Sequence, residues 1–136
     1  MPNSLPPFFS LSSEVLHAQS MDLPLVALES TVITHGLPHP ENLQLAQEME
    51  EQVRGMGAVP ATVAVLEGRV CVGLSPLQLE RLADQANEGL AKKISTRDIA
   101  PAVAHRQSGG TTVAATMAAA AMAGLRVFAT GGIGGV

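Results

Sequence analysis

The sequence contains few of the residues that anchor disulfide frameworks or aromatic cores. Its 136 residues include one cysteine, three phenylalanines and no tyrosine or tryptophan, although 46% are hydrophobic. A single cysteine, Cys71, excludes an internal disulfide and a cysteine-rich zinc site, so we expect it to fill core space in a reducing compartment. A core of Ala, Val, Leu and Met favours closely packed helix-on-sheet layers over a β-sandwich built around large rings.

Basic residues and long hydrophobic runs are also scarce. The formal net charge is −4, and the first lysine or arginine is Arg54. This balance argues against nucleic-acid polymers as partners, and the lack of early positive charge argues against an N-terminal targeting signal. The longest apolar run, residues 113–124, is shorter than the roughly 18 residues of a membrane span. We therefore expect an intracellular protein, in the cytoplasm or an organelle, with no membrane partner.

The apolar patterns predict an α/β fold. A continuous apolar run over 25–30 indicates a strand buried on both faces, as in a parallel sheet. Two β-rich runs separated by Glu67 and Gly68 predict a tight hairpin near 62–74. Helical spacing and end signals predict further helices and short strands, in chain order at 41–54 (helix), 75–88 (helix), 92–95 (strand), 96–105 (helix), 113–123 (helix) and 125–130 (strand). The expected architecture is layered α/β/α around a mixed, largely parallel sheet.

The two ends of the chain carry separate predictions. Residues 1–22 show no sustained period, so we expect a flexible leader with a short helical turn around 14–19, followed by a domain over 23–136. The glycine-rich segment 131–136 follows the last predicted strand. In open α/β sheets such a loop normally leads into a helix. We therefore expect an incomplete domain whose full fold extends past Val136.

One carboxylate interrupts the first buried strand. Glu29 follows an apolar run and precedes the hydroxyls of Ser30 and Thr31. Burying a lone carboxylate costs several kcal/mol, so such a group is usually paired or protonated. The spacing leaves two interpretations open: Glu29 pairs with a neighbouring basic residue, or it transfers protons.

Three further features are candidates for binding. The segment 108–112 combines glycines and hydroxyls before a helix, which suits either a phosphate cradle or a simple capped turn. Lys93 stands where a helix returns to a strand, and it is either a phosphate or carbonyl contact or a solvated cation like Lys92. His35 and His39 lie in a turn without a carboxylate at helical spacing, so we assign no metal ligand.

Several segments taken together are more specific than any one of them. On residues 29–36 (ESTVITHG), 57–62 (GAVPAT), 93–98 (KISTRD), 108–113 (SGGTTV) and 128–136 (FATGGIGGV), the chain resembles the pseudouridine-5'-phosphate glycosidases, also called pseudouridylate synthases, of the indigoidine synthase A-like family. The resemblance runs from about residue 24 to residue 136, the N-terminal part and less than half of the family's usual domain. It implies reversible cleavage of the C–C glycosidic bond of pseudouridine 5'-phosphate to uracil and ribose 5-phosphate.

The resemblance also implies roles for individual residues. Glu29 would be the proton donor, and Lys93 a contact suited to the substrate phosphate. Thr112 and Val113 would contact the substrate at the junction between loop and helix. Thr111 and Thr130 are lesser candidates.

Other parts of the family's mechanism are not assigned to this chain. The family uses a lysine nucleophile that takes the sugar as an opened, Schiff-base-like adduct, together with a manganese ion (Mn2+) held by an aspartate. Both side chains follow the glycine-rich segment in the family, beyond Val136. The resemblance further implies a homotrimer for the complete domain.

Two alternatives to an active glycosidase stay open at this point. One is a truncated, catalytically inactive fragment, for which an exposed last strand and an uncovered apolar surface would be aggregation hazards. The other is a stand-alone phosphosugar-binding module that rests on residues 108–113.

Overall fold

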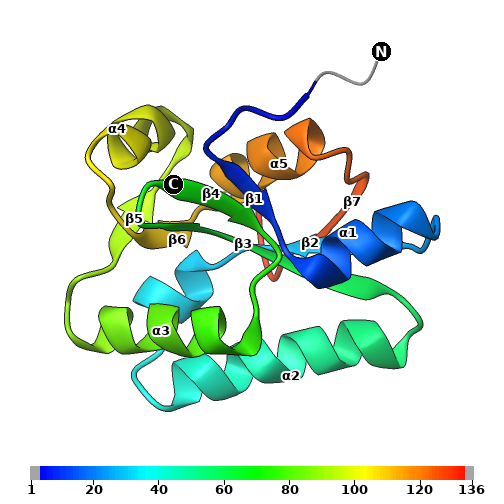
Figure 1. The fold of residues 1–136 in the computed structure, drawn as a ribbon. Helices are drawn as coiled ribbons and strands as arrows, with labels where there is room; N and C mark the ends of the chain where they lie inside the picture. Colours follow the sequence, from blue (N-terminus) through cyan, green and yellow to red (C-terminus); the bar gives the residue numbers. More distant parts are fainter. Residues whose placement is uncertain (1–3, 134–136) are drawn as a thin grey trace.

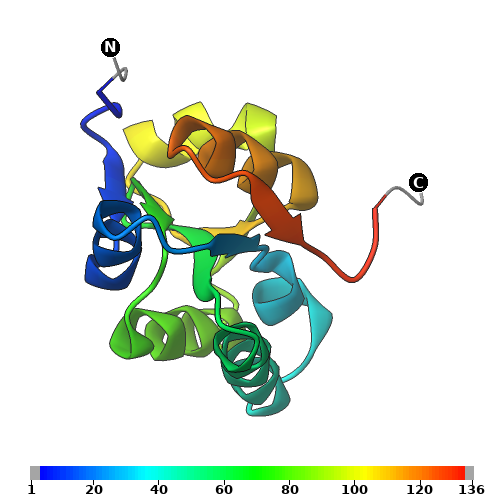
Figure 2. The ribbon, with the colours of Figure 1, turned by 90° about the vertical axis from the view of Figure 1, so that its right-hand side faces the viewer.

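The computed structural model describes residues 4–133, which form three layers with a sheet between two groups of helices (Figures 1 and 2). The strands are β1 (Phe9–Leu11), β2 (Leu25–Leu28), β3 (Val59–Leu66), β4 (Arg69–Val72), β5 (Lys92–Ile94), β6 (Gly109–Thr111) and β7 (Val127–Ala129). The helices are α1 (Ser13–Ser20), α2 (Glu41–Gly55), α3 (Pro76–Asn87), α4 (Ile99–Ala104) and α5 (Val113–Met122), with a short π-helix η1 (Val32–Gly36) and a 3-10 turn η2 (Thr96–Asp98). The predicted α/β/α architecture is confirmed.

The sheet is mixed and largely parallel, as expected. Its main path runs β1-β4-β3-β2-β7, and β6 joins β3 to β5. The pairs β1–β4, β2–β3, β2–β7 and β5–β6 are parallel, whereas β4 and β6 run antiparallel to β3. With β3 on one side and β7 on the other, β2 lies inside the sheet, which accounts for its continuous apolar sequence.

The long strand β3 organises the sheet because β2, β4 and β6 each pair with a different part of it. Strand β2 pairs with residues 59–62 of β3, and β6 pairs with Ala64 and Val65. Since β2 is parallel and β6 antiparallel to β3, the carboxyl ends of β2 and β6 approach each other at Val63. Residues that follow these two strands therefore meet at one point of the sheet.

Each face of the sheet has its own apolar core. One core includes Val63, Ile94 and Ala119 and is covered by α4 and α5, while the other includes Ile33, Ala46 and Leu82 and is covered by η1, α2 and α3 (Figure 2). No helix within residues 4–133 is both long and apolar enough to cross a membrane. Cys71 is a buried free thiol in the second core, as the sequence indicated.

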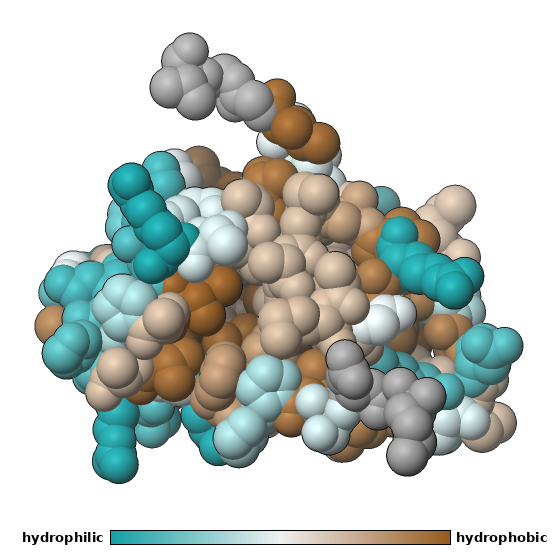
Figure 3. Space-filling view, turned by 90° about the horizontal axis from the view of Figure 1, so that it is seen from above, coloured by the Kyte–Doolittle hydropathy of each residue, from teal (hydrophilic) through white to brown (hydrophobic). Residues whose placement is uncertain are grey.

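The outer side of α5 is apolar as well. Seen from above, the surface over this part of the molecule is a broad area of weakly to strongly hydrophobic residues (Figure 3). On α5 the exposed positions include Ala114, Met117, Ala121 and Met122, and Met117 and Met122 are 52% and 53% exposed. A helix that is apolar on all sides is typical of a buried position, so this face has the composition of an interface.

Local sequence signals fixed the hairpin and the start of α3. Glu67 and Gly68 have φ angles of 50° and 77° and join β3 to the antiparallel β4. At the N-terminus of α3 the Ser75 hydroxyl accepts the Gln78 N–H (3.2 Å), and the Ser75 N–H donates to the Gln78 side chain (2.9 Å). This is the predicted capping box, with Pro76 as the first helical residue.

The prediction of a flexible leader over residues 1–22 is wrong for the segment that contains β1 and α1, although α1 confirms the helical turn expected around 14–19; residues 1–3 lie outside the described part. Strand β1 pairs in parallel with β4, from Phe9 opposite Val70 to Leu11 opposite Val72. Val15 and Ala18 on α1 are fully buried. The segment is too short to show a period by itself, but it covers β4, which would otherwise be the edge of the sheet.

The prediction of a loop over residues 108–112 is also wrong in part, because Gly109–Thr111 forms the buried strand β6. A Cβ atom on Gly110 would overlap the Thr34 hydroxyl and the Ser30 carbonyl, and one on Gly109 would overlap the Lys92 carbonyl. The two glycines therefore serve close packing between neighbouring segments rather than a phosphate cradle. The predicted glycine segment 131–136 lies partly outside the described residues.

Replacing Gly110 should test this packing. Gly110→Ala should lower the free energy of unfolding by roughly 2–4 kcal/mol, because η1 or β6 must move to admit the methyl group. The control Gly55→Ala places its Cβ in open space at the end of α2 and should raise stability by up to about 1 kcal/mol. Urea denaturation measures both, and equal effects would contradict the packing assignment.

Candidate active site at the carboxyl end of β2

A buried hydrogen-bond network joins the ends of β2 and β6. The Ser30 hydroxyl donates to the Val63 carbonyl (2.5 Å), and the Thr111 hydroxyl lies 2.8 Å from the same oxygen. The backbones also meet directly, because the Ser30 N–H donates to the Thr111 carbonyl (3.3 Å) and the Thr111 N–H to the Ser30 hydroxyl (2.8 Å). Ser30 and Thr111 are both fully buried, so their side chains hold the strand ends together and are not available to a ligand.

The same network reaches α5. The Thr111 hydroxyl lies 2.8 Å from the hydroxyl of Thr116, which is also fully buried. Thr112 caps α5, since its side chain accepts the Ala115 N–H (3.3 Å). The start of α5 is thereby fixed beside the carboxyl end of β2.

Glu29 follows β2 directly and is held by the last strand. Its Oε1 accepts a hydrogen bond of 2.5 Å from the hydroxyl of Thr130, which follows β7. Within residues 4–133 the salt bridges join Arg54 to Glu14 and Glu50, and Arg81 to Glu67, and none includes Glu29. A basic partner for Glu29, one of the two interpretations of the sequence, is therefore not found in the part that the structure describes.

Lys93 lies two strands away from Glu29, on an exposed position of β5. Its backbone partner in β6 is Gly110, so the Lys93 side chain leaves the sheet on the same face as a Cβ of Gly110 would, which is the face that carries η1. The Thr112 N–H donates to the carbonyl of Ile94, the residue after Lys93 (3.0 Å). Backbone hydrogen bonds thus run from Ser30, next to Glu29, to Thr111, and from Thr112 to Ile94, next to Lys93.

Of the four assigned positions, Glu29, Thr112 and Val113 adjoin the junction of β2, β6 and α5, and Lys93 lies on β5 beside β6; their side chains are not joined. Within residues 4–133 no hydrogen bond links the side chains of Glu29, Lys93 and Thr112, and Val113 is half-buried in the first turn of α5. Thr111 is a structural residue, whereas Thr130 contacts Glu29 directly. The Glu29 carboxylate and the N-terminus of α5 therefore lie beside the end of β2, whereas the Lys93 ammonium group lies on β5, the outer neighbour of β6.

The π-helix η1 was not predicted. It follows Glu29 closely, is tied to α2 by the buried Asn42 amide, which donates to the Ile33 carbonyl (3.1 Å), and packs Ile33 into the core. The Thr34 hydroxyl lies 2.7 Å from Nδ1 of His35, an exposed residue. A run of β-branched residues resembles a strand locally, and only the packing against α2 and α3 makes this segment helical.

A second carboxylate, which the sequence did not single out, is the buried acid among residues 4–133. Glu50 on α2 accepts the hydroxyl proton of Thr62 on β3 (2.8 Å) and pairs with Arg54 (3.2 Å), which also binds the exposed Glu14. Burial raises the pKa of the Glu50 carboxyl, while Thr62 and Arg54 oppose this shift. In the sequence Glu50 cannot be told apart from the surface acids of α2. Its burial results from the docking of α2 on β3.

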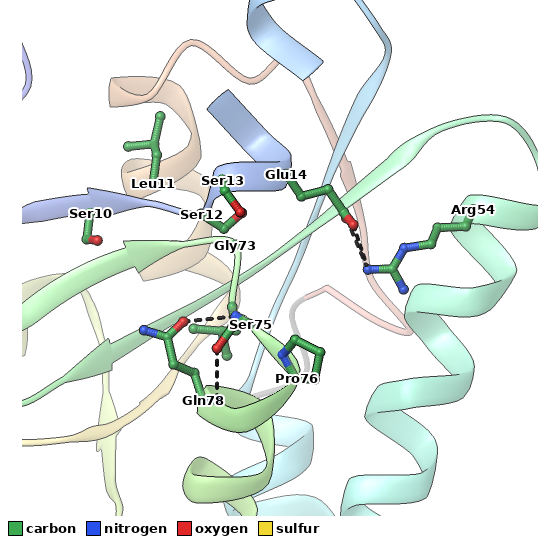
Figure 4. A pocket seen from close by; sticks show the side chains of 11 residues that line it. Ser10, Leu11, Ser12, Ser13, Glu14, Arg54, Gly73, Ser75, Pro76 and Gln78 are labelled. Atoms are coloured by element: carbon green, nitrogen blue, oxygen red, sulfur yellow. Dashed lines mark hydrogen bonds and ion pairs between the residues drawn. The ribbon is translucent and has the colours of Figure 1, made fainter. Parts of the chain in front are cut away.

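A cavity of about 380 Å³ lies near this cluster (Figure 4). It is enclosed by the end of β1, the start of α1, the turn after β4 and the start of α3, and Arg54 reaches across from α2 to Glu14 at its side. None of the residues assigned to the substrate lines it. Because both carboxylates beside Arg54 already bind its guanidinium, the cavity has no charged group left for an anion.

The manganese ion that the resemblance implies has no evident set of ligands here. Within residues 4–133 no three His, Cys, Asp or Glu side chains come together in a group that could hold a metal ion. Glu29 is bound to a hydroxyl, and His35 and His39 have no carboxylate beside them in this part of the chain. The described residues therefore do not fit a protein-bound metal centre.

The fold and the position of Glu29 define an α/β protein with an acid at the carboxyl end of a parallel strand, where α/β enzymes place their sites. Residues 14–136 match the family model of indigoidine synthase A-like proteins. The chain belongs to this family.

Curated relatives and solved structures agree with this assignment. The chain is 57% identical over 136 residues to a pseudouridine-5'-phosphate glycosidase of Saccharopolyspora erythraea and 56% identical over 125 residues to one of Rhizobium johnstonii, covering 100% and 92% of this chain but 43% and 38% of those proteins. A crystal structure of an indigoidine synthase A-like protein from Thermotoga maritima matches with a TM-score of 0.79 and 33% identity, over 94% of this chain and 40% of that one. The prealnumycin C-glycosynthase AlnA, in complex with ribulose 5-phosphate, matches with a TM-score of 0.81 and 42% identity, over 96% and 41%. The chain thus spans about two fifths of the length of these proteins.

A double-mutant cycle should show that Thr111 and Thr116 act as one unit. Thr111→Val should lower the free energy of unfolding by about 1–3 kcal/mol, because Thr116 and the Val63 carbonyl lose a buried partner. Thr116→Val should cost a similar amount, and the double variant less than the sum. Urea denaturation provides the values, with the exposed Thr96→Val as a control that changes little; full additivity would rule out the coupling.

Glu50 should make the stability of the fold depend on pH. Because its pKa is raised above the ordinary 4.5 in the folded chain, the stability that proton binding contributes is present below the unfolded pKa and is lost as pH rises through the folded pKa. The unfolding free energy of the wild type relative to Glu50→Gln should therefore decrease between about pH 4 and about pH 7. Denaturant titrations across this range test it. Glu51→Gln, which removes an exposed carboxylate from the same helix, is the matched control.

Proposed function

We propose that this chain forms the proton-transfer part of a pseudouridine-5'-phosphate glycosidase site, which cleaves the C–C glycosidic bond reversibly to uracil and ribose 5-phosphate. The observation that carries the proposal is the Glu29 carboxylate, held by Thr130 beside the junction of β2, β6 and α5. The names of the curated relatives support the substrate, and the phosphosugar bound to AlnA supports its chemical class.

The chemistry gives Glu29 a defined task. When the bond between the sugar and the uracil carbon breaks, that carbon leaves with the electron pair and must take up a proton, while the sugar carbon takes up a nucleophile and finally the oxygen of water. A carbon atom has no lone pair on which an acid could act beforehand, unlike the oxygen of an ordinary glycoside. An acid close to the leaving carbon therefore delivers the proton as the bond breaks, and its carboxylate recovers the proton in the reverse direction.

The remaining assigned residues suit the phosphosugar. Lys93 is exposed on β5 and offers a mobile positive charge to the phosphate. Thr112 and Val113 begin α5, whose first N–H groups and positive end favour an anion. In this proposal Thr112 acts through its backbone, because its hydroxyl already caps the helix.

Two further parts of the proposal rest on the family resemblance alone. They are a homotrimer, and a lysine nucleophile and a manganese ligand outside residues 4–133. A cytoplasmic location is proposed from the single cysteine and the lack of early positive charge. An inactive fragment is the second candidate, and the outer strand favours it: β7 forms an edge of the sheet, and Val127 is 55% exposed.

Release of uracil from pseudouridine 5'-phosphate in the presence of manganese tests the activity. Glu29→Gln should lower turnover by at least roughly 100-fold, because proton transfer by a positioned acid contributes about that much. Glu41→Gln, an exposed acid at the start of α2, is the matched control and should keep full activity. Turnover that survives Glu29→Gln would contradict the assigned role.

Binding of ribose 5-phosphate tests the phosphate contact independently of turnover. The ligand should raise the melting temperature of the wild type. Lys93→Ala should need about tenfold more ligand for the same rise. Lys92→Ala changes an equally exposed neighbour and should bind normally. Binding without turnover would favour the phosphosugar-binding fragment, and equal loss in both variants would leave Lys93 no specific role.

A further inference from the structure

The register of β2 and β7 brings Thr130 to Glu29. The two strands are parallel, with Leu28 opposite Ala129 as their last pair. Glu29 and Thr130 are the next residues on each strand, so they lie side by side where the pairing ends. The hydrogen bond between them, 2.5 Å from the Thr130 hydroxyl to Glu29 Oε1, is at the short end of the range for an O–H group and a carboxylate.

The Thr130 hydroxyl has a second acceptor within reach. Its oxygen lies 3.1 Å from the Gly132 carbonyl and also accepts the Gly132 N–H at 3.3 Å. A hydroxyl has one proton to donate and two lone pairs with which to accept. The proton can therefore point either to Glu29 or to Gly132, while the Gly132 N–H keeps the oxygen in place.

We infer that Thr130 is a positioning residue that holds Glu29 in both of its protonation states. When Glu29 is a carboxylate, Thr130 donates its proton to Oε1. When Glu29 is a carboxylic acid, its own O–H donates to the Thr130 oxygen, and the Thr130 proton turns to the Gly132 carbonyl. The role in catalysis rests on the proposed function, but the exchange of hydrogen bonds does not.

This arrangement suits an acid that gives up a proton in one direction of a reversible reaction and takes one up in the other. A partner that can only donate, such as an arginine, holds the carboxylate form at the expense of the acid form. A hydroxyl with its own second acceptor keeps one hydrogen bond to Glu29 before and after proton transfer. No proton is gained or lost by Thr130, since only the direction of its O–H bond changes.

The hydrogen bonds can be observed in the whole 136-residue chain by NMR. In wild type, the Glu29 side-chain carboxyl carbon should show a shift between H2O and D2O from the Thr130 hydroxyl, and the Gly132 amide should be protected from exchange. Thr130→Ser should keep both signals. Thr130→Val, which has nearly the same shape, should lose the carbon shift and exchange at Gly132 at least roughly tenfold faster. Unchanged signals in Thr130→Val would overturn the assignment.

The variant Glu29→Gln tests whether the Thr130 O–H can turn from Glu29 to the Gly132 carbonyl. Its side-chain amide imitates the protonated acid as a donor, so the Thr130 proton should move to Gly132, and the shift between H2O and D2O should appear at the Gly132 carbonyl carbon. The Gly132 amide should stay protected. Absence of any shift at this carbonyl would show that Thr130 serves the carboxylate form only.

Turnover separates this inference from the proposed function. If the chain releases uracil, Thr130→Val should lower kcat roughly tenfold with little change in KM, Thr130→Ser should recover most of it, and Thr96→Val should have no effect. If the chain is inactive while the NMR signals behave as expected, the proposed function fails for this chain and the positioning role stands. A Thr130→Val variant with full kcat would remove the role in catalysis.

Discussion

The hydroxyls of Ser30 and Thr111 both bond to the Val63 carbonyl and join the ends of two strands inside the sheet. Strands β2 and β6 reach the same edge of β3 from opposite directions, and a gap in the ladder remains where they meet. Ser30 and Thr111 close it by bonding to the Val63 carbonyl, and Thr116 extends the bonding to α5. Because all three side chains are fully buried, each would be costly if left without a partner. This junction positions Glu29, Thr112 and Val113, which adjoin it in the sequence.

At this junction, neighbouring residues of one short motif have different roles, some structural and some assigned to the proposed site. In the sequence Glu-Ser-Thr, Glu29 turns toward the last strand and Ser30 turns into the core. In Gly-Gly-Thr-Thr, the two glycines allow the backbone to pass close to η1 and β5, Thr111 joins the network and Thr112 caps α5. A short motif can thus carry adjacent residues whose physical tasks differ completely.

The surface of the molecule is consistent with a part of a larger assembly. The outer side of α5 is apolar, and β7 leaves one edge of the sheet open (Figures 2 and 3). The relatives are more than twice as long as this chain. Thr130, at the end of that open strand, is where the described fold contributes a contact to the acid of the proposed site.

Elements with local causes could be predicted from the sequence. Strand β2, the β3–β4 hairpin and the capped helix α3 follow from an unbroken apolar run, a two-residue turn with glycine, and a serine-proline-glutamine start. Glu29 was recognisable because a carboxylate inside an apolar run is costly. The family resemblance added roles for Lys93, Thr112 and Val113, which stay predictions.

Features that depend on contacts between distant segments could not be predicted from the sequence. Strand β1 forms by pairing with β4, β6 forms between β3 and β5, and η1 is helical because Ile33 packs under α2 and α3. Likewise, Glu50 is buried by the docking of α2, and Thr130 meets Glu29 across 101 residues through the register of two parallel strands. Sequence patterns report the period and chemistry of one segment, whereas pairing and burial are set by which other segment lies against it.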